Sequence, residues 1–439
     1  MNLADLDRCV SADGSEVYRR VFADQAVFAL EREYIFGTSW LYLCHDSQLK
    51  MPGDFITTYM ADTPIIVAHG EDGNIHASVN SCSHRGLPVC RADSGNAKRF
   101  VCPYHSWSYA VSGELVTIPQ ERHTCNARDR SSLSLKAVPR LESYRGLIFG
   151  SFNKGIESLE DYLGDMRFYL DSYFNRFPQG VEVLGEPHKW RLRANWKLPV
   201  ENQLGDVAHG PYLHATLLAD SPAVPEIDNY GYNCVPRPGH GAAVRLMPGD
   251  AAPQDIAWGL EGMAALSGNP EFMSYLLEVQ AKAAEQIGPV GARIKGLTYG
   301  VYPNLSFLWS NSTLRVSHPR GAKEVEYWSW WVVPADAPDS VKQLLRTNFT
   351  HMFGPGGLLE QEDSESWMQQ LKGSDISYMD DRPLYYGLGL GEETAHPELP
   401  GLVGSSYNEH YAREFYKRWR EDIDNGMRKK MGRNKAGAA

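Results

Sequence analysis

The chain has 439 residues, of which 43% are hydrophobic and 22% charged, so it is long enough to bury two hydrophobic cores. Its formal net charge is −11 and no basic face is evident, which argues against a nucleic-acid partner. Neither a signal peptide nor an apolar run of membrane-spanning length is visible, so we expect a cytoplasmic protein without a membrane partner.

The first 39 residues are expected to form a helical segment that packs on the second of two domains. Apolar residues recur at helical spacing between residues 16 and 35, namely Val17, Val21, Phe28 and Ile35. Trp40, Tyr42 and Leu43 then indicate entry into β structure. Residues 40–155 are strand-like, and the segments 65–67 and 75–79 are predicted to form a hairpin around the turn at 71–74.

Two cysteines and two histidines in this first domain form mixed pairs. Cys82 and His84 stand as C-x-H, and after seventeen residues Cys102 and His105 stand as C-x-x-H. In a Rieske [2Fe-2S] cluster two thiolates hold one iron and two imidazoles hold the other. The pattern therefore predicts a Rieske site and a chain that handles single electrons.

Two alternatives to a Rieske cluster fit the same four residues. One is a zinc site, although zinc fingers usually keep like ligands together in each pair. The other is a chance grouping of two core thiols and two surface imidazoles. The remaining cysteines are expected to be buried thiols without a disulfide framework: Cys9, Cys44, Cys90, Cys125 and Cys234.

Residues 156–427 are predicted to form the second, catalytic domain. Helical patterns begin at 159–174, a Pro- and Gly-rich loop is expected at 219–253, strands at 301–333 and a last helix at 407–427. The basic residues 428–439 are expected to be a disordered tail.

A second cluster of metal-capable side chains lies near residue 200. His209 and His214 are five residues apart, which on a regular helix separates them by about 140°. They can share a metal only if the helix is distorted, and Gly210-Pro211 can supply that distortion. A structural pair of histidines is the plainer interpretation.

An acidic segment offers a third ligand. One carboxylate with two histidines would complete the facial triad of non-haem iron(II) enzymes. The spacing does not choose among the candidates, and a solvated acidic helix is the alternative: Glu360, Glu362, Asp363 and Glu365.

Taken together, these motifs resemble the large (α) subunit of Rieske non-haem iron ring-hydroxylating dioxygenases, the group that includes naphthalene and biphenyl dioxygenases. The resemblance covers nearly the whole chain and includes segments 195–197, 201–206, 302–307, 318–321 and 360–367. It implies an α+β fold, with a β-rich Rieske domain and a catalytic domain whose antiparallel sheet is flanked by helices. It also implies a [2Fe-2S] cluster and a mononuclear Fe(II).

The resemblance further assigns residues. It places the carboxylate ligand of the iron at Asp363, beside His209 and His214. Asp206 matches the acid that links an iron-ligating histidine, here His209, to a Rieske histidine, here His105, of a neighbouring subunit. Such a bridge requires a closed ring of chains, and relatives of this type usually form α₃β₃ assemblies with a small β subunit.

Three departures from the family pattern bear on selectivity. Ser106 stands where relatives usually have glycine, Ala208 replaces a tyrosine, and Gly210-Pro211 lies between the two histidines. Glu362 stands where relatives often have a second aspartate. None of these changes removes a ligand.

The positions that match the family's substrate pocket are mainly apolar: Asn202, Leu217, Leu308, Phe353 and Leu359. A flat neutral arene suits such a pocket, whereas a carboxylated arene would need a cation such as Arg245, Arg293 or Arg315. By resemblance, electrons pass from NADH through a separate reductase, usually with a ferredoxin, and the product is a cis-dihydrodiol.

Three other functions stay open at this point. The chain could act on an aromatic carboxylate, or it could be a monooxygenase on the same scaffold. From a different class, it could be a Rieske electron-transfer protein without a catalytic iron.

Overall fold

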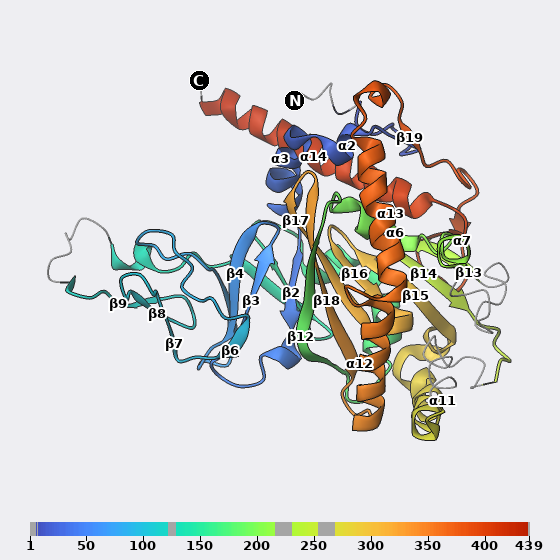
Figure 1. Ribbon diagram of the computed structural model, residues 1–439, viewed down its shortest axis with the longest axis horizontal. Coiled ribbons are helices and arrows are strands. Elements are labelled where there is room, and N and C mark those ends of the chain that lie inside the picture. The colour runs from blue at the N-terminus through green and yellow to red at the C-terminus, as the bar shows by residue number, and fades with distance from the viewer. Residues whose placement is uncertain (1–5, 7, 122–128, 216–230, 253–267, 438–439) are drawn as a thin grey trace. The chain divides into compact units, whose positions relative to one another are not determined.

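The computed structural model describes residues 6, 8–121, 129–215, 231–252 and 268–437 (Figure 1). The chain divides into two compact units, one of Phe36–Leu159 and one that joins Met1–Ile35 to Glu160–Ala439. The first unit is slightly wider than the predicted domain 40–155. The N-terminal segment belongs to the second unit.

The smaller unit is built from short antiparallel sheets. Their strand orders are β10-β11-β2, β5-β4-β3-β6 and β7-β8-β9. The strands are β2 (Leu41–His45), β3 (Asp54–Met60), β4 (Thr63–His69), β5 (Ile75–Val79), β6 (Ser94–Asn96), β7 (Arg99–Val101), β8 (Ser108–Ala110), β9 (Leu115–Thr117), β10 (Arg140–Tyr144) and β11 (Leu147–Ser151). The pairing of β4 with β5 confirms the predicted hairpin.

A hydrophobic core in this unit reaches the two cysteine-bearing loops. It includes the edge-to-face pair Phe55 and Phe100, whose ring centroids are 5.3 Å apart, and the buried thiols of Cys82 and Cys102. Because these thiols are part of the core, the loops that carry them are anchored by the packing of the unit.

The larger unit is organised around a nine-stranded sheet in the order β12-β18-β17-β16-β15-β14-β13-β21-β20. Every neighbouring pair in it is antiparallel. The strands are β12 (Val181–Leu192), β13 (Gly231–Val235), β14 (Gly241–Leu246), β15 (Ile294–Val301), β16 (Leu305–Leu308), β17 (Thr313–Gly321), β18 (Glu324–Pro334), β20 (Thr394–Ala395) and β21 (Leu402–Ser405). A separate small ribbon pairs β1 (Glu16–Val17) with β19 (Leu384–Tyr385).

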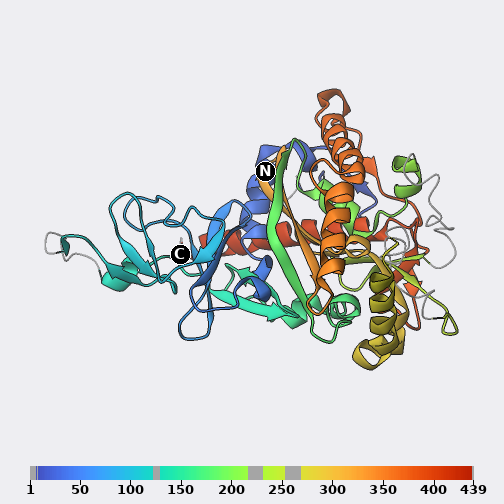
Figure 2. The ribbon, with the colours of Figure 1, turned by 60° about the horizontal axis from the view of Figure 1, so that its bottom comes forward.

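Helices flank this sheet, and α12 and α13 cross one of its faces (Figures 1 and 2). The helices are α2 (Arg20–Ala23), α3 (Gln25–Glu31), α4 (Leu159–Leu163), α5 (Met166–Phe174), α6 (Lys197–Gly205), α7 (Gly210–Leu213), α11 (Pro270–Arg293), α12 (Asp339–Phe353), α13 (Leu358–Ser374) and α14 (His410–Gly437). The architecture confirms the predicted α+β class.

Helix α6 lies unusually close to the sheet because the strands beneath it carry glycine. A Cβ at Gly241 would lie 2.5 Å from the carbonyl oxygen of Leu204, and one at Gly300 would lie 2.3 Å from a methyl of the same leucine. At the other end of the helix, the buried ammonium of Lys197 pairs with the buried Glu31 of α3 at 2.5 Å. The indole N–H of Trp196 also donates to Glu31, at 2.8 Å. These contacts fix the helix that leads into Asp206 and His209.

Three sequence-based expectations differ from the structure. The segment expected to be loop at 219–253 contains the hairpin β13–β14 within its described residues 231–252, where Pro236, Pro238 and Gly239 lie in the turn and the flanks pair as strands. Residues 16–35 are split among β1, α2, α3 and a π-helical turn at Arg32–Phe36. Helix α14 runs past Met427 to Gly437, so the tail expected to be disordered is helical to that residue.

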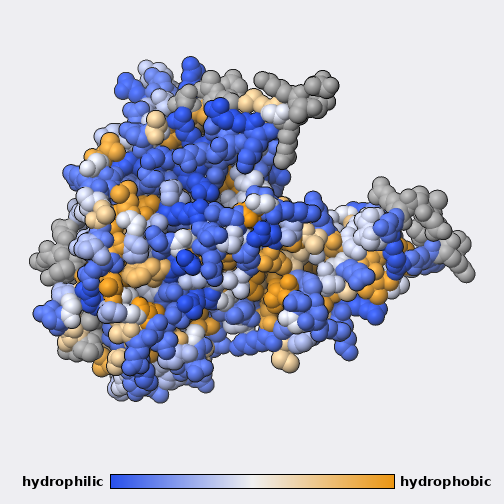
Figure 3. All heavy atoms as spheres, turned by 180° about the vertical axis from the view of Figure 1, so that it is seen from behind, coloured by the Kyte–Doolittle hydropathy of each residue, from blue (hydrophilic) through white to orange (hydrophobic). Residues whose placement is uncertain are grey.

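The surface carries scattered apolar side chains. On the face seen in Figure 3 these lie in small groups among hydrophilic residues. Tyr378 and Tyr212 are among the most exposed, at 92% and 76%. Within the part of the chain that the structure describes, none of the helices combines the length and apolar character needed to cross a bilayer.

Candidate metal centres

The loops that carry Cys82 and Cys102 have the same backbone hydrogen bonds. In each, the cysteine N–H donates to the carbonyl five residues later, and the N–H four residues later donates to the cysteine carbonyl, all at 2.8–2.9 Å. The residue that closes each loop is left-handed, with φ of +77° at Gly86 and +57° at Ser106. The serine that departs from the family pattern therefore occupies a conformation that favours glycine.

The side chains of these loops suit a cluster that is buried at one end and exposed at the other. Cys82 and Cys102 are 3% and 2% exposed, while His84 is exposed and His105 half-buried. The two imidazole rings lie 4.6 Å apart between centroids. Two thiols beneath two adjacent imidazoles form the donor set of a Rieske [2Fe-2S] group, so the residues fit it.

Two aromatic residues support this donor set. Trp107 stacks on His84, with centroids 5.0 Å apart and planes 6° apart. The hydroxyl of Tyr109 lies 3.3 Å from the sulfur of Cys82 and accepts a hydrogen bond from the N–H of Ser83. The tyrosine hydrogen is thus left to donate to the sulfur, a contact that tunes the reduction potential of an iron–sulfur cluster.

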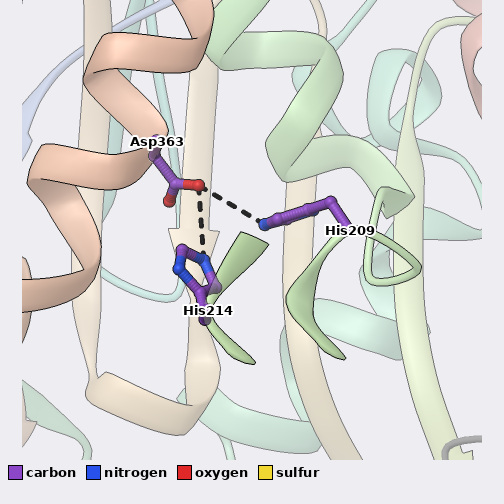
Figure 4. A group of neighbouring side chains, drawn as sticks. All are labelled: His209, His214 and Asp363. Atoms are coloured by element: carbon purple, nitrogen blue, oxygen red, sulfur yellow. Dashed lines mark ion pairs between the residues drawn. The ribbon is translucent and has the colours of Figure 1, made fainter. Parts of the chain in front are cut away.

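The second group is formed by His209, His214 and Asp363, whose ligand atoms lie within 4.8 Å of one another. The Nε2 atoms of both histidines are 3.4 Å from the same carboxylate oxygen, Oδ1 of Asp363 (Figure 4). Asp363 comes from α13 and the two histidines from the chain around α7. The fold therefore brings together side chains that are about 150 residues apart in the sequence.

The two histidines flank one helical turn and do not share a distorted helix. His209 precedes α7 and His214 follows it, while Pro211 stands in its first turn. At that position the missing N–H of proline has no helical partner to lose. The predicted distortion within a helix is therefore replaced by a single turn with a ligand at each end.

The far side of each imidazole faces an acid or an amide. Nδ1 of His214 lies 2.7 Å from Oε2 of Glu362. Nδ1 of His209 lies 3.5 Å from Oδ2 of Asp206 and 3.3 Å from Nδ2 of Asn202. The carboxylates of Glu362 and Asp206 favour a proton on each Nδ1, so that Nε2, which faces Asp363, is the nitrogen left to ligate a metal ion.

The group has the charge and geometry for a cation. Oδ1 of Asp363 is buried and accepts no hydrogen bond from any described residue. Burial opposes ionisation of Asp363, but the two histidines outweigh it and hold its pKa below the usual value. Burial likewise opposes protonation of His209, yet Asp206 and Asp363 raise its pKa to about 10. Two nitrogens and one oxygen on one side fit a non-haem iron.

The other acids of α13 lie elsewhere. Glu360 is fully buried and pairs with Arg315 at 2.9 Å. Glu362 contacts His214, and Glu365 is exposed and bonded to Gln369. Of the four candidates, Asp363 is the one that the structure brings to the two imidazoles.

The residues expected to line a substrate pocket have different surroundings. Asn202 lies beside His209, and Leu359 is buried in the first turn of α13, one turn before Asp363. Phe353 is buried at the end of α12, and Leu308 is half-buried at the end of β16. Leu217 lies outside the described residues.

Two supporting residues were missed by the sequence analysis. Tyr109 contacts the Cys82 sulfur, and Glu31 holds the start of α6. Neither stands in a motif, and both act across long separations in the chain, so no local signal marks them.

Comparison with known proteins places both centres in matching domains. Residues 39–144 match the Rieske [2Fe-2S] domain, and residues 159–425 match the catalytic domain of the ring hydroxylating alpha subunit. The chain is 36% identical to biphenyl dioxygenase subunit alpha of Metapseudomonas furukawaii, over 91% of this chain and 89% of that protein. It is 34% identical to benzene 1,2-dioxygenase subunit alpha of Pseudomonas putida, over 95% and 93%. A structure of naphthalene 1,2-dioxygenase with indole bound superposes with a TM-score of 0.87 at 31% identity, over 97% and 95% of the two chains.

Proposed function

The chain belongs to the family of ring-hydroxylating dioxygenase α subunits, which carry a Rieske [2Fe-2S] cluster and a mononuclear iron, and from this premise we propose that it cis-dihydroxylates a neutral aromatic ring. Cys82, His84, Cys102 and His105 hold the cluster in this proposal. His209, His214 and Asp363 hold the iron.

The observation that carries the proposal is the orphaned carboxylate oxygen between two imidazole nitrogens. An electron-transfer module would have no use for a buried Asp363 whose Oδ1 faces both Nε2 atoms at 3.4 Å. A buried carboxylate needs positive charge beside it, which protons on the two imidazoles can supply and which a metal ion held by the same three side chains would replace. The site therefore supports an oxygenase over the electron-transfer alternative.

The preference for a neutral arene rests on the partners of two of the three candidate cations, Arg315 and Arg293. Arg315 is fully buried and paired with Glu360. Arg293 binds the carbonyl of Met247 and pairs with Glu398. A substrate carboxylate would have to displace these acids, whereas an apolar ring can pack against Phe353 and Leu359.

Asp206 is proposed to connect the two kinds of centre between chains. Its carboxylate is 3.5 Å from Nδ1 of His209, and its side chain is about one-third exposed at 34%. A second acceptor position on Asp206 is thereby open to His105 of a neighbouring subunit. The proposal includes a ring of α subunits with small β subunits, and electrons drawn from NADH through a reductase with or without a ferredoxin.

The chain's own residues position the arene, orient the metal-binding imidazoles and exclude water. When bound, the two iron groups supply single electrons and the reduction of O₂. Glu362 and Asp206 orient the two imidazoles by accepting from their Nδ1–H groups. Phe353 and Leu359 hold the arene and keep water from the site.

The proposal is tested by reconstituting the iron-loaded protein with a reductase and a ferredoxin and offering naphthalene, biphenyl and benzoate separately. NADH-dependent O₂ uptake with a cis-dihydrodiol from either hydrocarbon is the expected result. Turnover of benzoate alone would overturn the neutral substrate. Asp363→Ala is expected to lose the mononuclear iron and keep the Rieske spectrum, while Glu365→Ala, exposed on the same helix, keeps both.

A further inference from the structure

Arg315 is the buried side chain that joins the metal-binding helix to the wall of the proposed substrate pocket. It lies on β17 and is 0% exposed, as is its ion-pair partner Glu360. The Nη1 to Oε2 distance is 2.9 Å. Glu360 precedes Asp363 by three residues on α13, so the two carboxylates share a face of one helical turn.

The same guanidinium contacts the aromatic residue at the end of α12. Its Cζ lies 5.0 Å from the ring centroid of Phe353, and its Nη2 donates to the Phe353 carbonyl at 3.4 Å. A third contact, from Nη1 to the hydroxyl of Tyr327 on β18, holds the guanidinium against the sheet. The planar guanidinium of Arg315 therefore contacts Glu360, Phe353 and Tyr327 at the same time.

We propose that Arg315 is a positioning residue that sets regioselectivity, because it fixes the Phe353 ring relative to the helix turn that presents Asp363. This inference rests on the proposed function. The arene packs against Phe353, and the bond that is attacked is the one nearest the metal held by Asp363. A shift of the ring relative to Asp363 therefore changes which bond of the arene is presented.

The electrostatics of the turn agree with this role. Burial raises the pKa of Glu360 to about 7, and Arg315 opposes that rise while Asp363 adds to it. Burial lowers the pKa of Arg315, but Glu360 outweighs this and raises it. The positive charge of the guanidinium thus offsets the negative charges of Glu360 and Asp363 on one helical turn, which a neutral side chain would not do.

Lysine is the informative replacement. Arg315→Lys keeps the positive charge for Glu360, but an ammonium on a flexible stem does not stack on an aromatic face and bind a carbonyl at once. Arg176 provides a matched control. It is also 0% exposed in the same unit, where it bonds to Ser172, Gln280, Gly291 and Ile294 and lies over Trp309. Arg176→Lys therefore reports what loss of a buried guanidinium does to the fold in general.

The experiment uses iron-loaded holoenzymes and biphenyl as probe. Three quantities are measured: iron per chain, the EPR spectrum of the nitric oxide adduct of the mononuclear Fe(II) with and without biphenyl, and the ratio of dihydrodiol regioisomers. Arg315→Lys is expected to keep its iron, to change the ratio by about threefold or more, and to alter the change that biphenyl makes in the EPR spectrum. Arg176→Lys is expected to keep the wild-type ratio and spectrum.

Three results would overturn the inference. A wild-type ratio and spectrum in Arg315→Lys would show that the guanidinium does not position the ring. An equal change of ratio in both variants would assign the effect to general loss of stability. If wild-type holoenzyme produced no dihydrodiol, the proposed function would fail together with the inference. If wild type produced dihydrodiol and Arg315→Lys kept the wild-type ratio and spectrum, the inference alone would fail.

Discussion

Oε2 of Glu362 lies 2.7 Å from Nδ1 of His214, on the side of the imidazole that faces away from Asp363. The carboxylate fixes the proton on Nδ1 and directs Nε2 at the metal position. Glu362 stands immediately before Asp363 on α13. Of these adjacent residues, Asp363 is a candidate metal ligand and Glu362 is the hydrogen-bond partner of another candidate ligand, His214.

Glu362→Gln is therefore expected to weaken Fe(II) binding about tenfold, because a neutral amide accepts the Nδ1 hydrogen bond less strongly than a carboxylate. The affinity is measured by titrating iron-depleted protein with Fe(II) against a competing chelator. Glu365→Gln, exposed on the same helix, provides the control. Equal affinities in wild type and Glu362→Gln would show that His214 is oriented by packing alone.

The choice of Asp363 among four acids shows where local sequence patterns stop. Glu360, Asp363 and Ser364 are buried while Glu365 is exposed, and this division depends on where α13 begins and which face the sheet covers. Spacing alone does not contain that information, so the assignment depended on the family resemblance. The Rieske loops differ because each keeps its ligands within four residues, and a local motif is enough to find them.

The β13–β14 hairpin was missed for another physical reason. Pro236, Pro238 and Gly239 favour a loop prediction but occupy only the turn between the two strands. Gly241 then serves the close approach of α6, which depends on a residue far away in the chain, Leu204. Tertiary proximity of this kind leaves no local signal.

Asp206→Ala is expected to leave both metal sites filled and to slow steady-state turnover about 100-fold, because His209 and the neighbouring subunit's cluster lose their shared carboxylate. Stopped-flow absorbance of a pre-reduced holoenzyme mixed with O₂ and biphenyl should show a cluster that stays reduced. Iron analysis and the visible spectrum check that the metals remain. Full activity in this variant would remove the bridging role.

Ser106→Gly is expected to stabilise the Rieske unit by about 0.5–1 kcal/mol, because a serine at φ +57° carries strain that glycine lacks. Gly86→Ala, at the equivalent place in the other loop, should destabilise it by about 1 kcal/mol, because alanine is strained at φ +77°; the added Cβ would meet only Ser81 Oγ at 3.7 Å, so no clash adds to that strain. Thermal loss of the visible circular dichroism of the cluster measures both. A lower midpoint for Ser106→Gly would show that the serine side chain makes a stabilising contact.

Glu201 predicts a pH dependence of stability. Its Oε2 accepts hydrogen bonds from Tyr386 and Tyr416, and burial raises its pKa from 4.5 to about 8. Between these values the unfolded chain has lost a proton that the folded protein keeps, so stability falls as pH rises from 4.5 and levels off above 8.

Glu201→Gln removes this titration and still accepts both tyrosine hydrogen bonds. The variant should gain stability over wild type as pH rises from 5 to 8, by on the order of 2 kcal/mol after allowance for partial exposure. Urea midpoints at the two pH values measure the gain. A difference between variant and wild type that is the same at both values would show that Glu201 is ionised throughout.

The fate of ¹⁸O₂ in a single product distinguishes ring dioxygenation from monooxygenation. Iron-loaded wild-type protein with its redox partners is given biphenyl under ¹⁸O₂, and the product is analysed by mass spectrometry. Ring dioxygenation predicts a cis-dihydrodiol with two labelled oxygen atoms. A product with one labelled atom would contradict ring dioxygenation and identify a monooxygenase.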